Sequence, residues 1–148
     1  MDIPKISLEE VEWNAMCFGC GKANKHGLQM KFDQVDIGTA RSEFTPGENH
    51  QGWPGYVHGG ILMAALDEAI GWAAHFNKIY TVTAKFETRL KSMARIGEPL
   101  IVTASITERT SRTLEVQAKI TRKDGSVVAE ASSIQFIIQP PKAHSSKS

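Results

Sequence analysis

The segment with the clearest chemical potential is the loop at residues 51–60, QGWPGYVHGG, together with the apolar stretch behind it. The loop contains four glycines and ends on His58, Gly59 and Gly60, directly before a run of helix-forming residues. Backbone N–H groups at a helix start have no partner inside the helix, and the helix dipole adds partial positive charge there. Such donors suit a carbonyl oxygen that becomes an oxyanion, although paired glycines are also typical of a sharp turn into a helix.

A carboxylate lies inside the apolar stretch, at Asp67. Burying a carboxylate without partners is costly, so Asp67 must be paired, protonated or exposed in a cleft. A general base and a carboxylate bonded to loop backbone are both consistent with this position. Glu68 is rotated by about 100° from Asp67 around a helix, so the two carboxylates do not share one site. Glu68 is the weaker candidate for the base, since it also fits a solvated or salt-bridged role.

The distance along the helix sets a constraint on any shared chemistry. Gly60 and Asp67 are seven residues apart, or roughly 10 Å at about 1.5 Å per residue. A general base must lie about 3 Å from its proton, or one water molecule away. A carbonyl bound by the N–H of Gly59 or Gly60 is therefore beyond the reach of Asp67 in the same chain. If both groups act on one substrate, Asp67 comes from a second subunit, and we expect a homodimer with two equivalent sites.

The elements that must position these residues follow from hydrophobic periodicity. Residues 61–76 predict a helix that is apolar, and therefore buried, on nearly every side. Alternation with a period of two predicts four strands after it, at residues 82–90, 100–106, 114–120 and 127–138. The first of these strands has Thr83 on its polar side, together with Lys85 and Glu87. Asp124 and Gly125 are a hairpin signal between the last two strands.

Two shorter strands are expected before the helix, at residues 28–35 and 39–44, with Gly38 at their turn. The resulting order is β-β-α-β-β-β-β. Because the later strands have short links, they are expected to be antiparallel neighbours. The sequence therefore predicts an α+β fold in which one helix packs on one face of an antiparallel sheet, while the other face meets water.

Composition and length narrow the class of protein. The chain has 148 residues, of which 41% are hydrophobic and 22% charged, as expected for one globular domain. We expect this domain at residues 1–139, with 1–27 as a lead-in and 140–148 as a flexible tail. A net charge of +1 argues against nucleic acid or a membrane surface as partner, and no apolar run is long enough to span a bilayer. Two cysteines and the absence of a signal-peptide core favour the cytoplasm.

The spacing of these residues resembles that of the hotdog-fold acyl-CoA thioesterases of the PaaI-like type. The similarity lies in VHGGILMAALDEAIG, where the carboxylate follows His58 by nine residues on an apolar helix before an antiparallel sheet. The longer stretch QGWPGYVHGG…LDEAIG is most similar to the branch that contains the mitochondrial long-chain acyl-CoA thioesterases. The element order fits the family over residues 28–138, and CFGCGKANKHGLQMKF at residues 17–32 resembles a lead-in of bacterial members. In this family the sheet wraps around one long central helix.

The resemblance implies hydrolysis of an acyl-CoA to a free acid and coenzyme A at a dimer interface, without a cofactor. The N–H of Gly59 or Gly60 would polarise the thioester carbonyl, and His58 would help to hold that site. Asp67 of the partner subunit would act as general base on water or as nucleophile. A hydroxyl group on the next strand orients the water in many members, and by spacing it falls on Thr83.

The substrate-binding candidates extend this site on both sides. Val57, Gly59 and Thr81 are expected to contact the substrate, while Lys91 and Arg95 are the best candidates for binding the phosphates of coenzyme A. Basic residues at such positions are also typical of a solvated sheet face. The resemblance further implies a homodimer that can pair into a dimer of dimers.

Alternatives remain open at two points. Cys17 and Cys20 form a C-x-x-C that could be half of a zinc site with His26, or a redox pair, but a lone pair is a weak signal and we predict no metal. For function, the alternatives are a non-catalytic acyl-CoA-binding module and an enoyl-CoA hydratase. The sequence lacks the pattern of Asp and His before the helix that is typical of the hydratases. It also lacks a helix-turn-helix, which argues against a DNA-binding regulator.

Overall fold

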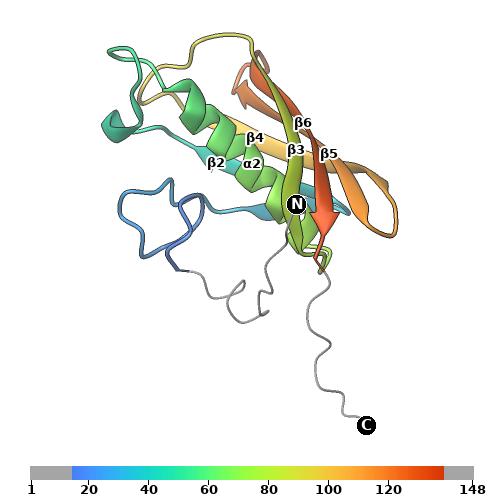
Figure 1. The fold of residues 1–148 in the computed structure, drawn as a ribbon. Coiled ribbons are helices and arrows are strands. Elements are labelled where there is room, and N and C mark those ends of the chain that lie inside the picture. Colours follow the sequence, from blue (N-terminus) through green and yellow to red (C-terminus); the bar gives the residue numbers. More distant parts are fainter. Residues whose placement is uncertain (1–14, 139–148) are drawn as a thin grey trace.

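The computed structural model describes residues 15–138 as one curved sheet packed on one long helix (Figure 1). The predicted tail at 140–148 and the first part of the lead-in lie outside the described residues. The elements are β1 (Asp33–Asp36), β2 (Thr39–Phe44), the short 3-10 helix η1 (Glu48–His50), α2 (Gly59–His75), β3 (Thr81–Leu90), β4 (Leu100–Arg109), β5 (Thr113–Arg122) and β6 (Val127–Ile137).

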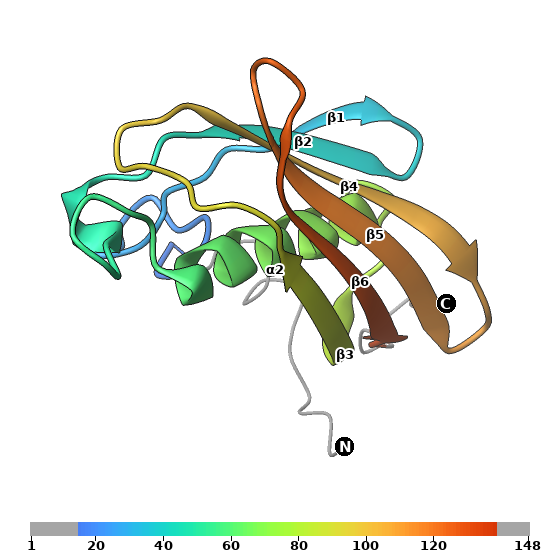
Figure 2. The same ribbon diagram turned by 90° about the horizontal axis from the view of Figure 1, so that it is seen from above.

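All six strands form one antiparallel sheet in the order β1-β2-β4-β5-β6-β3. This confirms the predicted β-β-α-β-β-β-β order and the α+β hotdog arrangement, with the sheet wrapped around α2. Figure 2 shows the sheet curving over the helix, with β1 and β3 at its two edges. The outer side of β3 has no strand partner among residues 15–138. The hairpin at Asp124 and Gly125 is also confirmed, with Gly125 at φ +89°.

The extent of the first strand was predicted wrongly. β1 contains only Asp33–Asp36, and the segment before it is not a strand. Leu28 and Met30 are nevertheless buried in the core, and their N–H groups donate to the carbonyls of Phe18 at 2.8 Å and Gly19 at 2.9 Å. The alternation of apolar residues there reports burial in the core and not pairing within the sheet.

Helix α2 begins two residues earlier than predicted and is less buried than predicted. Its buried residues face the sheet; they are Leu62, Ala65, Leu66, Ala69, Ile70, Ala73 and Ala74. On the opposite side Asp67 is exposed, and Met63 retains 37% of its surface. A single chain therefore leaves one side of α2 open to solvent, the side that carries Gly60, Met63 and Asp67.

Candidate active site

The first turn of α2 presents one free backbone donor. His58 is the N-cap residue, and its Nδ1 accepts a hydrogen bond from the N–H of Gly60 at 2.9 Å. The N–H of Ile61 donates to the carbonyl of His58, also at 2.9 Å. The N–H of Gly59 has no hydrogen-bond acceptor among the described residues. Of the two glycines predicted as oxyanion donors, only Gly59 therefore has its N–H available for a ligand.

A pocket of about 460 Å³ lies directly at this donor. It is lined by Gly52, Trp53, Val57, His58 and Gly59. Val57 is buried, whereas Trp53 is 75% exposed and forms an open wall. A Cβ atom on Gly52 would lie only 3.1 Å from the Cα of His58, so glycine lets the loop pass close to the capping residue.

Two short bridges hold the loop in front of the helix. Gln51 pairs with Val57, and Tyr56 pairs with Arg95. The Arg95 guanidinium also lies over the Tyr56 ring, 5.4 Å from its centroid. Gly55 turns the loop at φ +85°, a conformation that favours glycine. These contacts bring Arg95, one of the two predicted phosphate-binding residues, to the loop that lines the pocket.

The carboxylate of Asp67 belongs to a different, polar cluster at the edge of the sheet. The Thr83 hydroxyl donates to Oδ1 of Asp67 at 2.8 Å. Gln135 on β6 donates from Nε2 to the Thr83 hydroxyl at 3.0 Å, and the Thr81 hydroxyl donates to Oε1 of Gln135 at 2.9 Å. Thr81, predicted to contact the substrate, therefore contacts Gln135. The cluster orients the Thr83 hydroxyl toward the carboxylate.

Gln135 was missed by the sequence analysis. It is almost fully buried, with 1% of its surface exposed, and lies directly opposite Thr83 in the β3–β6 ladder. A signal was present, because Gln135 is a polar residue between the apolar Ile134 and Phe136. Because a buried side-chain amide needs hydrogen-bond partners, a glutamine at this position indicates a polar cluster around it.

Within one chain the two parts of the predicted site are not brought together. Asp67 is eight residues after Gly59 on the same helix, which is roughly 12 Å. Neither Asp67 nor Thr83 lines the pocket at the helix start. The geometry is therefore that of two half-sites on one helix, an oxyanion donor at its start and a carboxylate in its middle.

The second predicted phosphate ligand, Lys91, is already engaged in an ion pair. Its Nζ lies 2.6 Å from Oε1 of Glu130. The Lys91 ammonium lowers the pKa of the Glu130 carboxyl below its ordinary value, by hydrogen bonding and by charge. Lys91 must leave this exposed pair before it can bind a phosphate.

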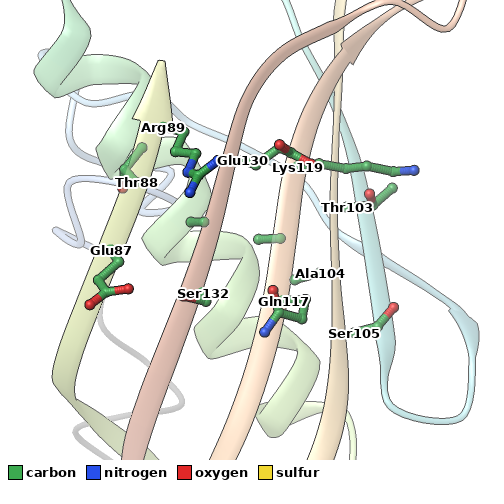
Figure 3. A pocket seen from close by; sticks show the side chains of 12 residues that line it. Glu87, Thr88, Arg89, Thr103, Ala104, Ser105, Gln117, Lys119, Glu130 and Ser132 are labelled. Atoms are coloured by element: carbon green, nitrogen blue, oxygen red, sulfur yellow. The ribbon is translucent and has the colours of Figure 1, made fainter. Parts of the chain in front are cut away.

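A larger hollow of about 670 Å³ lies on the outer face of the sheet, away from α2 (Figure 3). It is lined by polar residues of neighbouring strands, among them Thr103, Gln117 and Ser132, with the buried Ala104 and Ala118 beneath them. Figure 3 shows Arg89, Glu130 and Lys119 around one end of it. It contains none of the predicted site residues, so this hollow and the candidate chemistry lie in different places.

One group of described residues has metal-binding character. Cys17, Cys20 and Glu68 bring their ligand atoms within 4.8 Å of one another. Burial, followed by hydrogen bonding and repulsion from the Glu68 carboxylate, raises the pKa of the Cys20 thiol far above its usual range. His26, the ligand considered from the sequence, is not in this group, and Glu68 takes its place. None of the helices in the described part of the chain is long and apolar enough to cross a membrane.

The chain is similar to known proteins both in sequence and in fold. The sequence model of a family described as the thioesterase superfamily matches residues 54–129. No curated protein sequence matches the chain. The Escherichia coli PaaI protein, from the phenylacetic acid degradation operon, is similar in structure with a TM-score of 0.75 and 19% identity, covering 89% of this chain and 93% of that one.

Two further solved structures share the fold. Zebra fish thioesterase superfamily member 2 has a TM-score of 0.73 and 19% identity, covering 90% of this chain and 99% of that one. A hypothetical thioesterase from Streptococcus pneumoniae, solved with coenzyme A, has a TM-score of 0.71 and 17% identity, covering 76% and 88%.

Proposed function

Because the chain belongs to the thioesterase superfamily, we propose that it hydrolyses an acyl-CoA thioester to a free acid and coenzyme A. The observation that carries the proposal is the exposed Asp67 carboxylate, oriented by the Thr83 hydroxyl at 2.8 Å on a helix whose first turn leaves the Gly59 N–H free. Similar proteins from Streptococcus pneumoniae and Streptococcus mutans were solved with coenzyme A and with acetyl-CoA. Their ligands support coenzyme A as the carrier of the substrate.

The complete site is proposed to form between two copies of the chain. The open face of α2 carries Asp67 and the partly exposed Met63, and Leu90 beside it at the end of β3 is 47% exposed. A second copy, related by a two-fold axis beside α2, would cover this face and the free edge of β3. With the two helices antiparallel, Asp67 of the partner subunit would approach the Gly59 N–H of the first chain. The separation of roughly 12 Å between Gly59 and Asp67 of one chain would then no longer keep the two groups from acting on one substrate.

In this arrangement the thioester carbonyl oxygen accepts the hydrogen bond from the Gly59 N–H, and the helix dipole stabilises the negative charge that develops there. As general base, the Asp67 carboxylate takes a proton from water while the water oxygen bonds to the carbonyl carbon. The C–S bond then breaks and coenzyme A leaves as the thiol after protonation. As nucleophile, Asp67 would instead form an anhydride that water cleaves. His58 acts by holding the first turn of the helix, since its Nδ1 accepts from Gly60.

A pattern in one relative supports the pairing of Asp67 with Thr83. The Streptococcus pneumoniae protein was also solved with a single aspartate changed to alanine and with a single threonine changed to alanine. The two altered positions are sixteen residues apart in that chain, the same separation as Asp67 and Thr83 here. This spacing supports the proposal that both residues belong to one functional unit.

The first experiment measures thioester hydrolysis on a panel of acyl-CoAs of different chain length, with wild-type protein and Asp67→Asn. Asp33→Asn on the exposed strand β1 is the matched control. We expect turnover that Asp67→Asn largely abolishes and the control retains. Undiminished hydrolysis by Asp67→Asn would reject the base, and binding of acyl-CoA by wild type without any turnover would favour the non-catalytic binding module.

A second experiment tests whether the site is shared between chains. Gly59→Pro and Asp67→Asn chains are each expected to be inactive alone. Mixed and exchanged, half of the dimers are heterodimers with one intact site out of two, so about a quarter of the wild-type rate should return. No recovery despite demonstrated subunit exchange would contradict a site split between subunits.

A further inference from the structure

The cluster formed by Cys17, Cys20 and Glu68 is independent of the chemistry proposed for Asp67. Glu68 is the next residue on α2, but its carboxylate faces the lead-in loop. The Cys17 Sγ lies 3.6 Å from Oε1 and 3.7 Å from Oε2 of Glu68. All three side chains are half-buried, and their ligand atoms lie within 4.8 Å of one another.

The loop that carries the two thiols is held rigidly in this position. The N–H of Gly21 donates to the carbonyl of Cys17 at 2.8 Å, which folds the C-x-x-C into a tight turn. A Cβ on Gly21 would lie 2.4 Å from the carbonyl oxygen of Ala15. A Cβ on Gly19 would lie 2.1 Å from Oε2 of Glu68, so the loop backbone is packed directly onto the carboxylate. Side chains at these two positions would push the thiols away from Glu68.

We propose that Cys17, Cys20 and Glu68 bind a zinc ion that fastens the lead-in loop to helix α2. Two thiolates and one carboxylate are ligands that Zn²⁺ accepts, and soft thiolates disfavour Mg²⁺ or Ca²⁺. Binding replaces the two thiol protons, which pass to solvent, so the metal and its three ligands carry a net charge of −1. Water completes the tetrahedral coordination. The ion resolves the repulsion among three groups that would otherwise be mutually unfavourable as anions.

The geometry favours a metal over a disulfide between the same two cysteines. A disulfide is neutral, and it gains nothing from a carboxylate that turns both of its oxygens toward one sulfur. It would leave Glu68 half-buried without a compensating charge, since Glu68 has no ion-pair partner in the described part of the chain.

The consequence of the zinc ion would be structural. The lead-in loop delivers Leu28 and Met30 into the core, and Phe32 after it stacks on Trp72 of α2 with ring centroids 6.0 Å apart. A crosslink between this loop and Glu68 stabilises the same contacts, because metal binding adds to folding stability where the unfolded chain has no preformed site.

The test uses the full chain, with three measurements on wild type. Metal analysis of protein purified without chelator should give about one zinc per chain. Cobalt(II) in place of zinc should give the intense thiolate-to-metal absorption of a tetrahedral site. Addition of a chelator should lower Tm, and zinc chloride should restore it.

Variants assign the ligands. Cys17→Ser and Cys20→Ser should each lose the zinc and the thiolate absorption. Glu68→Gln keeps both thiols and the side-chain shape, and should weaken zinc affinity by about tenfold or more. Glu87→Gln, an exposed carboxylate on β3, is the matched control and should bind zinc as wild type does. If the serine variants fail to fold, the zinc affinity of Glu68→Gln and the cobalt spectrum of the wild type still test whether this cluster binds the metal.

Three results would overturn the proposal. One is a chain with two free thiols that takes up no zinc from a zinc chloride solution. Another is a Cys17–Cys20 disulfide, seen as a mass two hydrogens lower with no metal present. The third is a Glu68→Gln protein with unchanged zinc affinity, which would remove the carboxylate from the ligand set.

Discussion

Two adjacent carboxylates on α2, Asp67 and Glu68, have entirely different surroundings. Asp67 is exposed on the open face of the helix and accepts a hydrogen bond from the Thr83 hydroxyl on the edge strand. Glu68 points to the lead-in loop, where its neighbours are the thiols of Cys17 and Cys20. The difference arises from the rotation of about 100° between consecutive residues on a helix.

The neighbours of a carboxylate, more than its place in the sequence, determine what it can do. A carboxylate that is oriented by a hydroxyl and open to solvent is placed to take a proton from water. The Glu68 carboxylate instead lies half-buried against two thiols, where its oxygens have the geometry of metal ligands.

Changing each carboxylate to its amide should separate the two roles most sharply. Asp67→Asn should reduce kcat by about 100- to 10,000-fold, since the amide cannot accept the proton. The loss in Asp67→Asn should exceed that in Glu68→Gln by at least about tenfold. The measurement is kcat for a good acyl-CoA substrate, below the Tm of both proteins. Equal losses of kcat in the two variants would contradict the different roles proposed for Asp67 and Glu68.

The oxyanion donor can be removed without changing any side chain that accepts a proton. Gly59 is the first residue of α2, where proline is well tolerated, and His58 before it has a compatible extended backbone with ψ 134°. Gly59→Pro deletes the free N–H and should reduce kcat by about 100- to 1000-fold. Gly59→Ala is the matched control, because it adds a Cβ 3.0 Å from Leu90 and keeps the N–H. Equal values of kcat in the two variants would contradict the role of the Gly59 N–H as oxyanion donor.

The hydroxyl that distinguishes the surroundings of Asp67 is a smaller contributor. Thr83→Val removes the hydrogen bond to the carboxylate, and we expect kcat to fall by about ten- to a hundredfold. Thr83→Ser keeps the hydroxyl and should recover most of the rate. Thr103→Val, on the outer face of the sheet, serves as the control for the same chemical change. A serine variant as slow as the valine variant would indicate a packing role for Thr83.

Arg95, the candidate for binding coenzyme A, should affect KM without the loss of kcat expected for the Asp67 carboxylate. Arg95 is exposed, so its loss should raise KM by only about two- to fivefold while kcat stays close to wild type. Arg109→Ala at the end of β4 is the matched control. The increase in KM for Arg95→Ala should shrink at high salt, and a salt-independent change would point to the stacking of Arg95 on Tyr56 instead of charge.

A third carboxylate provides a reference for a purely local role. Ser126 donates to Oδ1 of Asp124 from its hydroxyl at 2.7 Å and from its backbone at 2.8 Å, which lowers the pKa of the Asp124 carboxyl below its ordinary 3.8. A lowered pKa in the folded state contributes stability at neutral pH, and this contribution is lost as the pH falls through the folded pKa. Asp124→Asn should therefore lower Tm slightly at pH 7.

The pH series supplies the check on this reference. The difference in Tm between wild type and Asp124→Asn should shrink as the pH falls below the ordinary pKa of an aspartate, and hydrolysis at neutral pH should be unaffected. A difference that grows in acid would contradict the assignment of the hydrogen bonds.

Much of the fold was accessible from the sequence, because strong periodicity specified α2 and the four strands after it. Thr83 shows where simple alternation fails. Counting by two assigns Thr83 to the polar side with Lys85, but the β3–β6 ladder changes register between these two residues. The extra residue in this bulge moves Thr83 onto the side of Asp67. Bulges depend on the pairing of two strands, so one strand's pattern does not reveal them.

The candidate site was predictable to a similar degree. His58, Gly59 and Asp67 were proposed from the sequence, because a glycine pair at a helix start and a carboxylate inside an apolar helix are unusual. The engagement of the Gly60 N–H by His58 was not predictable, since it depends on the side-chain rotamer at the N-cap. Glu68 and the two cysteines are 51 and 48 residues apart in the sequence, and only the packing of the lead-in loop on α2 brings them together.

The free edge of β3 gives self-association a protective value beyond catalysis. Its ten residues offer backbone groups without a strand partner in the described chain, and such edges recruit foreign strands and start aggregation. A second copy covering this edge would shield it at the moment when it completed the pair of half-sites. Turnover and the protection of this edge would then depend on the same association of two subunits, and dilution that separates them would weaken both.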